Sequence, residues 1–123
     1  MTLNDAITRY KEMRTSTKLS QEQMIDAISR LDKLVNINIY ATHEGGERDF
    51  SGYDPDGDLS LELLVPSPYD DMYIDWLDCQ GELLARDYKR YNSAATVYDA
   101  KFQKFSADYN RTHMPVQKKR RYF

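Results

Sequence analysis

The chain has 123 residues and a formal net charge of −3, with 41% hydrophobic and 30% charged residues. This length suits one domain with a modest core, and the charge excludes a protein that attracts nucleic acid over its whole surface. A single cysteine excludes an internal disulfide, and no stretch approaches the roughly 20 apolar residues that span a bilayer. We expect a soluble chain made in a reducing cytoplasm, with no membrane partner.

Two helices are predicted in the N-terminal third of the chain. The first covers residues 2–13, and its apolar stripe at helical spacing consists of Leu3, Ile7, Tyr10 and Met13. The second begins after Ser20, which forms a capping box with Gln23. Its apolar residues recur at intervals of three and four, and we expect it to end near Gly46, a suitable helix C-cap.

The segment from Glu47 to Pro66 is rich in acids, glycine and proline. Residues 54–58 read Asp-Pro-Asp-Gly-Asp, which is a composition typical of turns. Residues 59–63 alternate apolar and polar side chains, which is the period of a short strand. We therefore predict a long loop with a short strand or β-hairpin, and loops of this length in small domains are commonly functional.

Two further helices are predicted in the C-terminal half. The third starts at Pro68, capped by Ser67, and continues to Tyr91. After a short turn, Ser93 caps the fourth helix, which ends before Pro115. The short turn predicts an antiparallel hairpin. The heptad-like seam of the fourth helix consists of Ala95, Tyr98, Phe102, Phe105 and Tyr109.

These patterns predict a mostly α fold: a small bundle of about four helices with a long central loop or short β-hairpin. Residues 1–115 are expected to form a single helical domain, and residues 116–123 an extended basic C-terminal arm. The arm would bind nucleic-acid phosphates, enter an acidic groove of a protein partner, or remain a solvated tail. Its charged and aromatic residues are Lys118, Lys119, Arg120, Arg121, Tyr122 and Phe123.

The acidic turn in the middle of the chain does not fit a calcium site. Asp54, Asp56 and Asp58 alternate like the opening of an EF-hand loop. That loop needs Gly at its sixth position and Glu at its twelfth, where this chain has Leu59 and Val65. A polar turn is the favoured interpretation, and we expect no metal and no cofactor.

Motifs for catalysis also fail at the positions that the chemistry requires. His43 begins a pattern like that of zinc proteases, but the second histidine is replaced by Glu47. Cys79 is expected on a helix near Asp75 and Asp78, whose negative charges oppose thiolate formation. We therefore expect no catalytic residues and no enzymatic activity.

Ten tyrosines are more than a core of this size needs. Tyrosine joins a large apolar ring to a polar tip, so it is enriched at protein interfaces. The surplus rings are expected either on a surface that meets a partner or at the edges of the core.

Several strings resemble a family of small neck proteins from long-tailed bacteriophages of Gram-positive bacteria. Members of this family are described as head–tail connectors or head-completion adaptors. The resemblance extends over residues 36–115. It rests on the strings Thr42–Glu47, Phe50–Asp54, Leu63–Pro66, Pro68–Tyr73 and Tyr109–Pro115.

The resemblance implies a largely helical structural protein of the virion. Such subunits form a ring, commonly of about twelve copies, beneath the portal protein. DNA passes through the ring without sequence-specific contact, and a tail-side neck or stopper protein docks on it. The alternative is a small helical nucleic-acid-binding or regulatory protein that acts through its basic arm.

In the adaptor hypothesis, long loops and terminal arms reach neighbouring molecules. We therefore expect the arm, including residues 118–123, to contact the portal. We expect the central loop to contact a neighbouring copy through Phe50, Tyr53, Asp54, Asp56, Asp58, Leu61 and Leu63.

Overall fold

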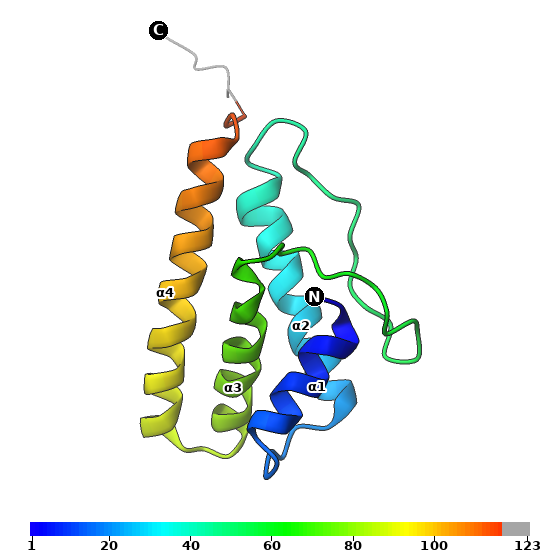
Figure 1. Ribbon diagram of the computed structural model, residues 1–123, viewed down its shortest axis with the longest axis vertical. Helices are drawn as coiled ribbons and strands as arrows, with labels where there is room; N and C mark the ends of the chain where they lie inside the picture. Colours follow the sequence, from blue (N-terminus) through cyan, green and yellow to red (C-terminus); the bar gives the residue numbers. More distant parts are fainter. Residues whose placement is uncertain (117–123) are drawn as a thin grey trace, which may run out of the picture.

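The computed structural model describes residues 1–116 of the chain. Within that range it contains four α-helices, a π-helical segment and a 3-10 segment, joined by turns and one long loop (Figure 1). The mostly α fold with about four helices is therefore confirmed. The predicted basic arm falls on residues 117–123, which lie outside the described part of the chain, apart from its first residue, Val116.

The first helix, α1 (Leu3–Met13), begins with a capping box formed by Thr2 and Asp5. The Thr2 hydroxyl accepts a hydrogen bond from the backbone N–H of Asp5 at 3.1 Å. The Asp5 carboxylate accepts the backbone N–H of Thr2 at 3.1 Å in return. Two backbone donors that the helix itself leaves unpaired are satisfied in this way, which fixes where the helix starts.

The second helix, α2 (Gln21–Val35), has the predicted capping box between Ser20 and Gln23. It continues into the π-helical segment η1 (Asn36–Tyr40), where Ala41 N donates to Asn36 O at 2.7 Å. The helical region therefore ends at Tyr40, and a series of turns occupies the residues up to Gly46.

The third helix starts later than predicted. Tyr69 N donates to Pro66 O at 3.0 Å, so a turn stands where Ser67 was expected to cap the helix. A 3-10 segment, η2 (Tyr69–Asp71), follows this turn, and α3 (Met72–Leu84) begins only after it. The predicted start at Pro68, with Ser67 as its cap, is therefore wrong.

The turn between the last two helices also differs from the prediction. Arg86 has a φ of 57°, a left-handed conformation that ends α3 early. Asp87 then caps α4 (Tyr88–Thr112), because its carboxylate accepts the backbone N–H of Arg90 at 3.1 Å. Ser93, the predicted cap, lies inside α4. The antiparallel hairpin of the third and fourth helices is nevertheless present (Figure 1).

Residues 59–63 form neither a strand nor a hairpin. Their backbone pairs instead with the start of the chain: Leu3 N donates to Leu61 O at 2.9 Å, and Leu63 N to Met1 O at 3.0 Å. This pairing yields only one isolated β-bridge, because the partner segment enters α1 after two residues. The predicted strand is wrong, whereas the long central loop is present.

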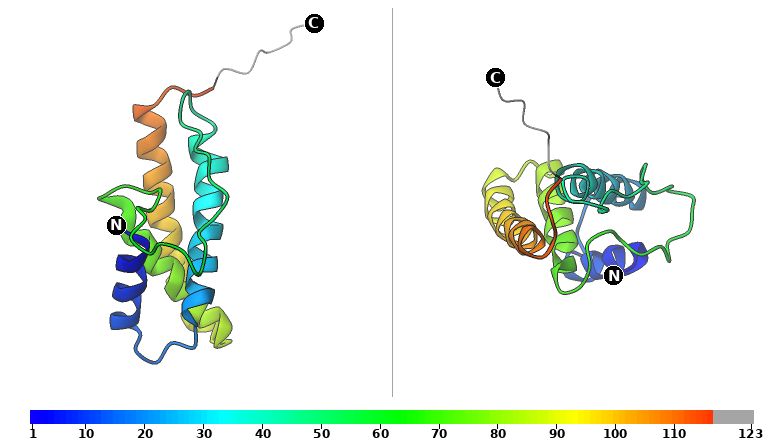
Figure 2. Two further views of the ribbon diagram at one scale, coloured as in Figure 1. Left: turned by 90° about the vertical axis from the view of Figure 1, so that its right-hand side faces the viewer. Right: turned by 90° about the horizontal axis from the view of Figure 1, so that it is seen from above.

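The core lies between α1, α2 and α3, and α4 covers its outer side through α3 (Figure 2). Within α4 only Phe105 is fully buried, and the other aromatic residues of the predicted seam are partly buried against the core. The loop lies on the opposite side of the bundle from α4 (Figures 1 and 2). The largest fully buried side chains include Leu3, Tyr10, Met24, Ile28, Leu31, Val35, Tyr73 and Leu77.

Candidate functional site

The central loop, residues 47–66, is held to the helices at both ends. Near its start, Arg48 N donates to Asn36 Oδ1 at 2.8 Å, and Asn36 Nδ2 donates to Arg48 O at 2.7 Å. Near its end, Val65 N donates to the Tyr73 hydroxyl at 2.8 Å. These bonds satisfy backbone groups of the loop that would otherwise need water, so its ends have a defined position.

The middle of the loop is joined to the core through a buried carboxylate. Asp32 of α2 has 0% exposure, and it accepts the Tyr73 hydroxyl at 2.6 Å and Leu64 N at 3.2 Å. The Tyr53 hydroxyl also donates to Asp32, and Tyr53 N donates to Ser29 Oγ at 2.9 Å. Burial raises the pKa of Asp32, and the hydrogen bonds that it accepts oppose this shift.

The raised pKa of Asp32 predicts a pH dependence of stability. The folded protein binds this proton more tightly than the unfolded chain does, so stability from this group is largest below the unfolded pKa. That contribution is lost as the pH rises through the folded pKa. As the pH is lowered from about 7 to about 4, we expect the free energy of unfolding of the wild type to rise relative to that of Asp32→Asn. Urea unfolding of both proteins at each pH measures this difference in free energy. A wild type that loses stability relative to Asp32→Asn as the pH falls would refute the prediction.

The tip of the loop is a series of exposed acidic turns. Asp54 Oδ1 accepts the backbone N–H of Asp56 at 2.9 Å, and Asp58 Oδ1 accepts that of Ser60 at 2.8 Å. The Ser60 hydroxyl also donates to Asp58 at 2.6 Å, and this bond together with that of the Ser60 backbone lowers the pKa of Asp58. Among residues 1–116, no group of three or more acidic, histidine or cysteine side chains is arranged to hold a metal ion. The tip therefore presents fixed negative charge to solvent.

The residues predicted to contact a neighbour do not all lie on the surface. The three aspartates of the tip are exposed, as is Leu61 with 47% exposure. Phe50 is half-buried and packs edge-on against Tyr53, with ring centroids 4.9 Å apart. Tyr53 is half-buried too, and its hydroxyl is engaged with Asp32. Leu63 has only 6% exposure and belongs to the core, so the candidate contact surface does not include it.

The tyrosine surplus is located mainly in the core and at its edges. Of the nine tyrosines within residues 1–116, only Tyr88 is exposed, at 60%. Tyr10, Tyr40 and Tyr73 are buried, and the remaining five are partly buried. Of the two interpretations that the composition left open, the structure favours the core edge.

Cys79 is buried on α3. Burial, together with the negative charges of Asp78 and Asp75, raises the pKa of the thiol to about 11. A thiolate nucleophile needs the opposite environment, an exposed and electropositive one.

The structure brings together two histidines that are far apart in the sequence. The His43 ring is buried, and its Nδ1 donates to Ile39 O at 2.6 Å. Tyr109 lies against its edge at 4.7 Å between centroids and stacks on His113 at 3.7 Å. This aromatic cluster ties the end of α4 to the end of η1, which no local sequence pattern indicated.

The start of the arm is fixed at the same end of the bundle. Glu44 N donates to Met114 O at 2.9 Å, and Val116 N donates to Thr42 O at 2.8 Å. The predicted arm residues Lys118, Lys119, Arg120, Arg121, Tyr122 and Phe123 lie outside the described residues.

A groove of about 1120 Å³ runs between α2, the loop and the end of α3. Its lining mixes apolar and charged side chains, among them Leu84, Tyr53 and the exposed Asp26–Arg30 ion pair. Enclosed ligand sites are concave and mostly apolar. This groove is open and only partly apolar, so it suits contact with a protein better than an enclosed small molecule.

The fold is that of a small four-helix protein with an acidic loop and an open groove on its surface. No helix within residues 1–116 has the length and apolar character to cross a membrane. Comparisons of the chain with protein-family models, with curated proteins and with solved structures found no match.

Proposed function

We propose that the protein is a structural virion component of a phage neck, forming a ring between the portal and the tail. The observation that carries this proposal is an exposed acidic loop held rigidly on a helical bundle by Asp32 and Asn36. A rigid loop loses little conformational entropy when it binds a partner, so it suits repeated contacts between identical subunits.

The strings that resemble phage neck proteins also make contact in space. The string from Thr42 pairs with the string that ends at Pro115 through the isolated bridge between His43 and Pro115. A Cβ atom on Gly46 would lie 2.4 Å from Tyr40 O and 2.9 Å from the Tyr109 hydroxyl. Gly46 and Tyr109, which come from different strings, therefore constrain each other physically.

In this proposal each part of the molecule has a role. The exposed loop residues contact a neighbouring copy, the arm contacts the portal, and a tail-side neck or stopper protein docks on the finished ring. DNA passes through the channel without sequence-specific contact. The acidic character of the body, with its net charge of −3 for the whole chain, would keep DNA from adhering to the wall.

The proposal is tested by the mass of the full-length protein in solution, alone and with the cognate portal ring. We expect stoichiometric capture by the portal or assembly into a large ring. A protein that ignores the portal at every salt concentration would overturn the proposal. DNA affinity that falls steeply with salt and depends on the arm would then favour the nucleic-acid-binding alternative.

Removal of residues 116–123 tests the role of the arm. We expect the truncated protein to fold with the same helical content and to join portal-bearing heads at reduced occupancy. Circular dichroism checks the fold, and quantification of the protein on purified heads measures occupancy. A matched control replaces the basic residues 118–121 with serine and keeps the chain length. Full occupancy of the truncated protein would show that the arm does not contact the portal.

A further inference from the structure

We infer that the outer face of α4 docks on the acidic central loop of a second copy, so that copies associate head to tail. This inference deepens the proposed function, because it names the surface of the neighbour that the loop meets.

The outer face of α4 is a continuous strip with an unusual composition. None of its residues belongs to the buried core, because α4 packs on the bundle around Phe105. At the start of α4, the strip borders a shallow groove that it shares with Asp75, Asp78 and Glu82 of α3. The residues of the strip recur at intervals of three and four, all of them are exposed, and small or apolar side chains separate the basic ones. The strip, which we call the basic strip, consists of Lys89, Ser93, Val97, Ala100, Lys104, Ala107 and Arg111.

The basic strip combines positive charge with room for close approach. Lys101 points inward, where it pairs with Asp75 at 2.6 Å. Lys104 and Arg111 are 72% and 73% exposed, and both pair with Asp108 of the same helix. Exposed ion pairs of this kind contribute little to stability, so these two cations can exchange Asp108 for an acidic group of a second molecule. Val97 of the strip is 47% exposed. Small side chains allow another surface to come near the helix backbone, and the flanking cations select a surface of negative charge.

The loop supplies that charge. Residues 47–62 contain six acidic residues and a single basic one, Arg48. The Arg48 guanidinium is engaged within the chain, since it donates to Gly46 O at 2.8 Å and lies 4.9 Å above the Tyr40 ring. Asp49 and Asp56 are exposed, and within residues 1–116 their carboxylates have no hydrogen-bond or ion-pair partner. Their charge is therefore available to a second molecule.

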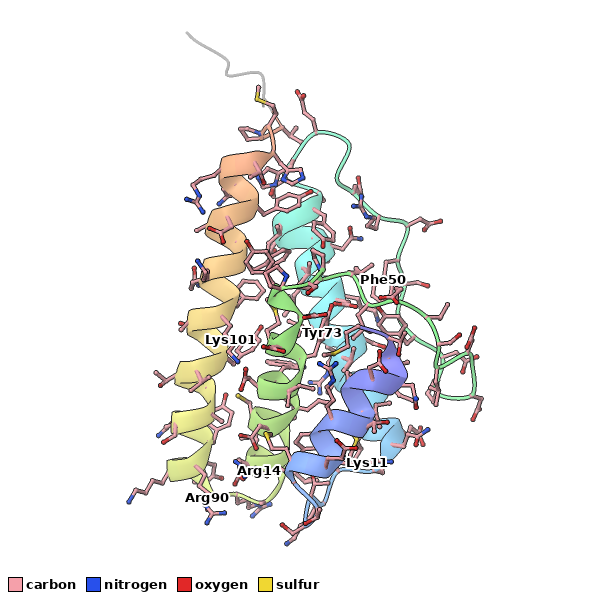
Figure 3. All side chains as sticks on the ribbon, in the orientation of Figure 1. Lys11, Arg14, Phe50, Tyr73, Arg90 and Lys101 are labelled. Atoms are coloured by element: carbon pink, nitrogen blue, oxygen red, sulfur yellow. The ribbon has the colours of Figure 1, made fainter. Side chains whose placement is uncertain are left out.

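The two surfaces lie on opposite sides of one molecule, so they cannot satisfy each other within it. Figure 3 shows Arg90 and Lys101 on α4 and Phe50 on the far side of the bundle, and the view from above in Figure 2 agrees. A two-fold dimer would place like charges together, either two loops or two basic strips. Contact between unlike surfaces is heterologous, and such contacts repeat into a ring or a filament.

The experiment uses two charge-reversed forms of the full-length protein. The strip variant carries Lys89→Glu and Lys104→Glu, and the loop variant carries Asp49→Lys and Asp56→Lys. All four residues are exposed, so the fold should be retained, which circular dichroism checks. Sedimentation at low ionic strength measures self-association. We expect each variant alone to associate about tenfold or more weakly than the wild type, because like charges then face each other.

Mixing the two variants is the decisive step. In the mixture, the acidic strip of one variant meets the basic loop of the other, and the unchanged surfaces also match. We expect the equimolar mixture to regain the association of the wild type. A control with Lys11→Glu and Lys18→Glu changes the net charge as much as the strip variant does but leaves both surfaces intact, and it should associate normally.

The outcomes separate this inference from the proposed function. Unchanged association of either variant, or no recovery on mixing, would overturn the assignment of the two faces while portal capture still decides the adaptor role. A wild type that stays monomeric at millimolar concentration and low salt would overturn the inference as well. Loss of DNA binding in the strip variant, with self-association intact, would assign the basic strip to nucleic acid instead.

Discussion

Replacing Asp32 with alanine should lower the free energy of unfolding by about 3–5 kcal/mol, because one buried and two half-buried donors lose their acceptor, and a donor left unsatisfied in the interior costs about 1–3 kcal/mol. The donors are the hydroxyls of Tyr53 and Tyr73 and the backbone N–H of Leu64. The carboxylate is shielded from bulk solvent, since Asp32 and Tyr73 each have 0% exposure. Urea unfolding followed by circular dichroism measures the change.

The same substitution should loosen the loop before it unfolds the bundle. Leu64 and Val65 donate to Asp32 and Tyr73 respectively, so their amide hydrogens should exchange faster in Asp32→Ala than in the wild type. The matched control is Asp26→Ala on the same helix, where the carboxylate is exposed and, among residues 1–116, pairs only with Arg30. That change should cost less than about 1 kcal/mol. Equal effects of the two substitutions would mean that the Asp32 cluster does not hold the loop.

The parts of the fold that the sequence predicted well are those decided by neighbouring residues. The start of α2 depends on Ser20 and Gln23, which are three positions apart and bond to each other's backbone. The buried face of α2 depends on apolar residues spaced by three and four. Both are local properties of the chain, so the sequence alone contains them.

The turn between α3 and α4 could not be placed in this way. Leu84, Tyr88 and Tyr91 continue the apolar spacing of α3, which favoured an uninterrupted helix. In the structure Leu84 is 45% exposed and Tyr88 60% exposed, so this spacing does not mark a buried face. The chain turns at Arg86, and α4 folds back along α3. Aspartate and serine are equally good N-cap residues, so the sequence could not distinguish Asp87 from Ser93 as the cap of α4.

The composition of the candidate site could be predicted from the sequence, but the attachment of the loop to the helices could not. The acidic character of the loop and its exposed tip follow from residues 54–58. Its attachment depends on Asp32, more than twenty positions earlier than Leu64, and no local pattern links the two. One signal was present: Asp32 follows Ile28 by four positions, so it stands on the apolar face of α2, where a carboxylate needs buried donors.

The basic strip was missed for a different reason. Sequence patterns identify the face of a helix that is apolar, and the seam through Phe105 was found correctly. The exposed face of α4 can be recognised as a candidate contact surface only when its charge is compared with that of the loop, which lies on the other side of the molecule. That comparison requires the arrangement of the elements in space, because Lys104 and Asp56 are 48 positions apart.

Replacing Phe105 with alanine should lower the free energy of unfolding by about 3–5 kcal/mol, because it leaves a cavity in the core. Phe105 has 2% exposure and is the one fully buried residue of α4. Its ring packs against Tyr69 at 5.2 Å and edge-on against Tyr40 at 6.3 Å between centroids, which joins α4 to η2 and to η1. Guanidinium unfolding measures the loss. Limited proteolysis should also show cleavage within α4 before the rest of the bundle is cut.

The control for Phe105→Ala is Val97→Ala, a truncation on the opposite face of the same helix. Val97 is 47% exposed, so the change should cost less than about 1 kcal/mol and leave proteolysis unchanged. Comparing the two variants distinguishes an effect of loosening α4 from the bundle from an effect of changing its exposed face. If α4 must be held on the bundle to present the basic strip, Phe105→Ala should weaken self-association although it alters no exposed charge. A destabilised Phe105→Ala protein that still associates like the wild type would show that the contact between copies does not require a docked α4.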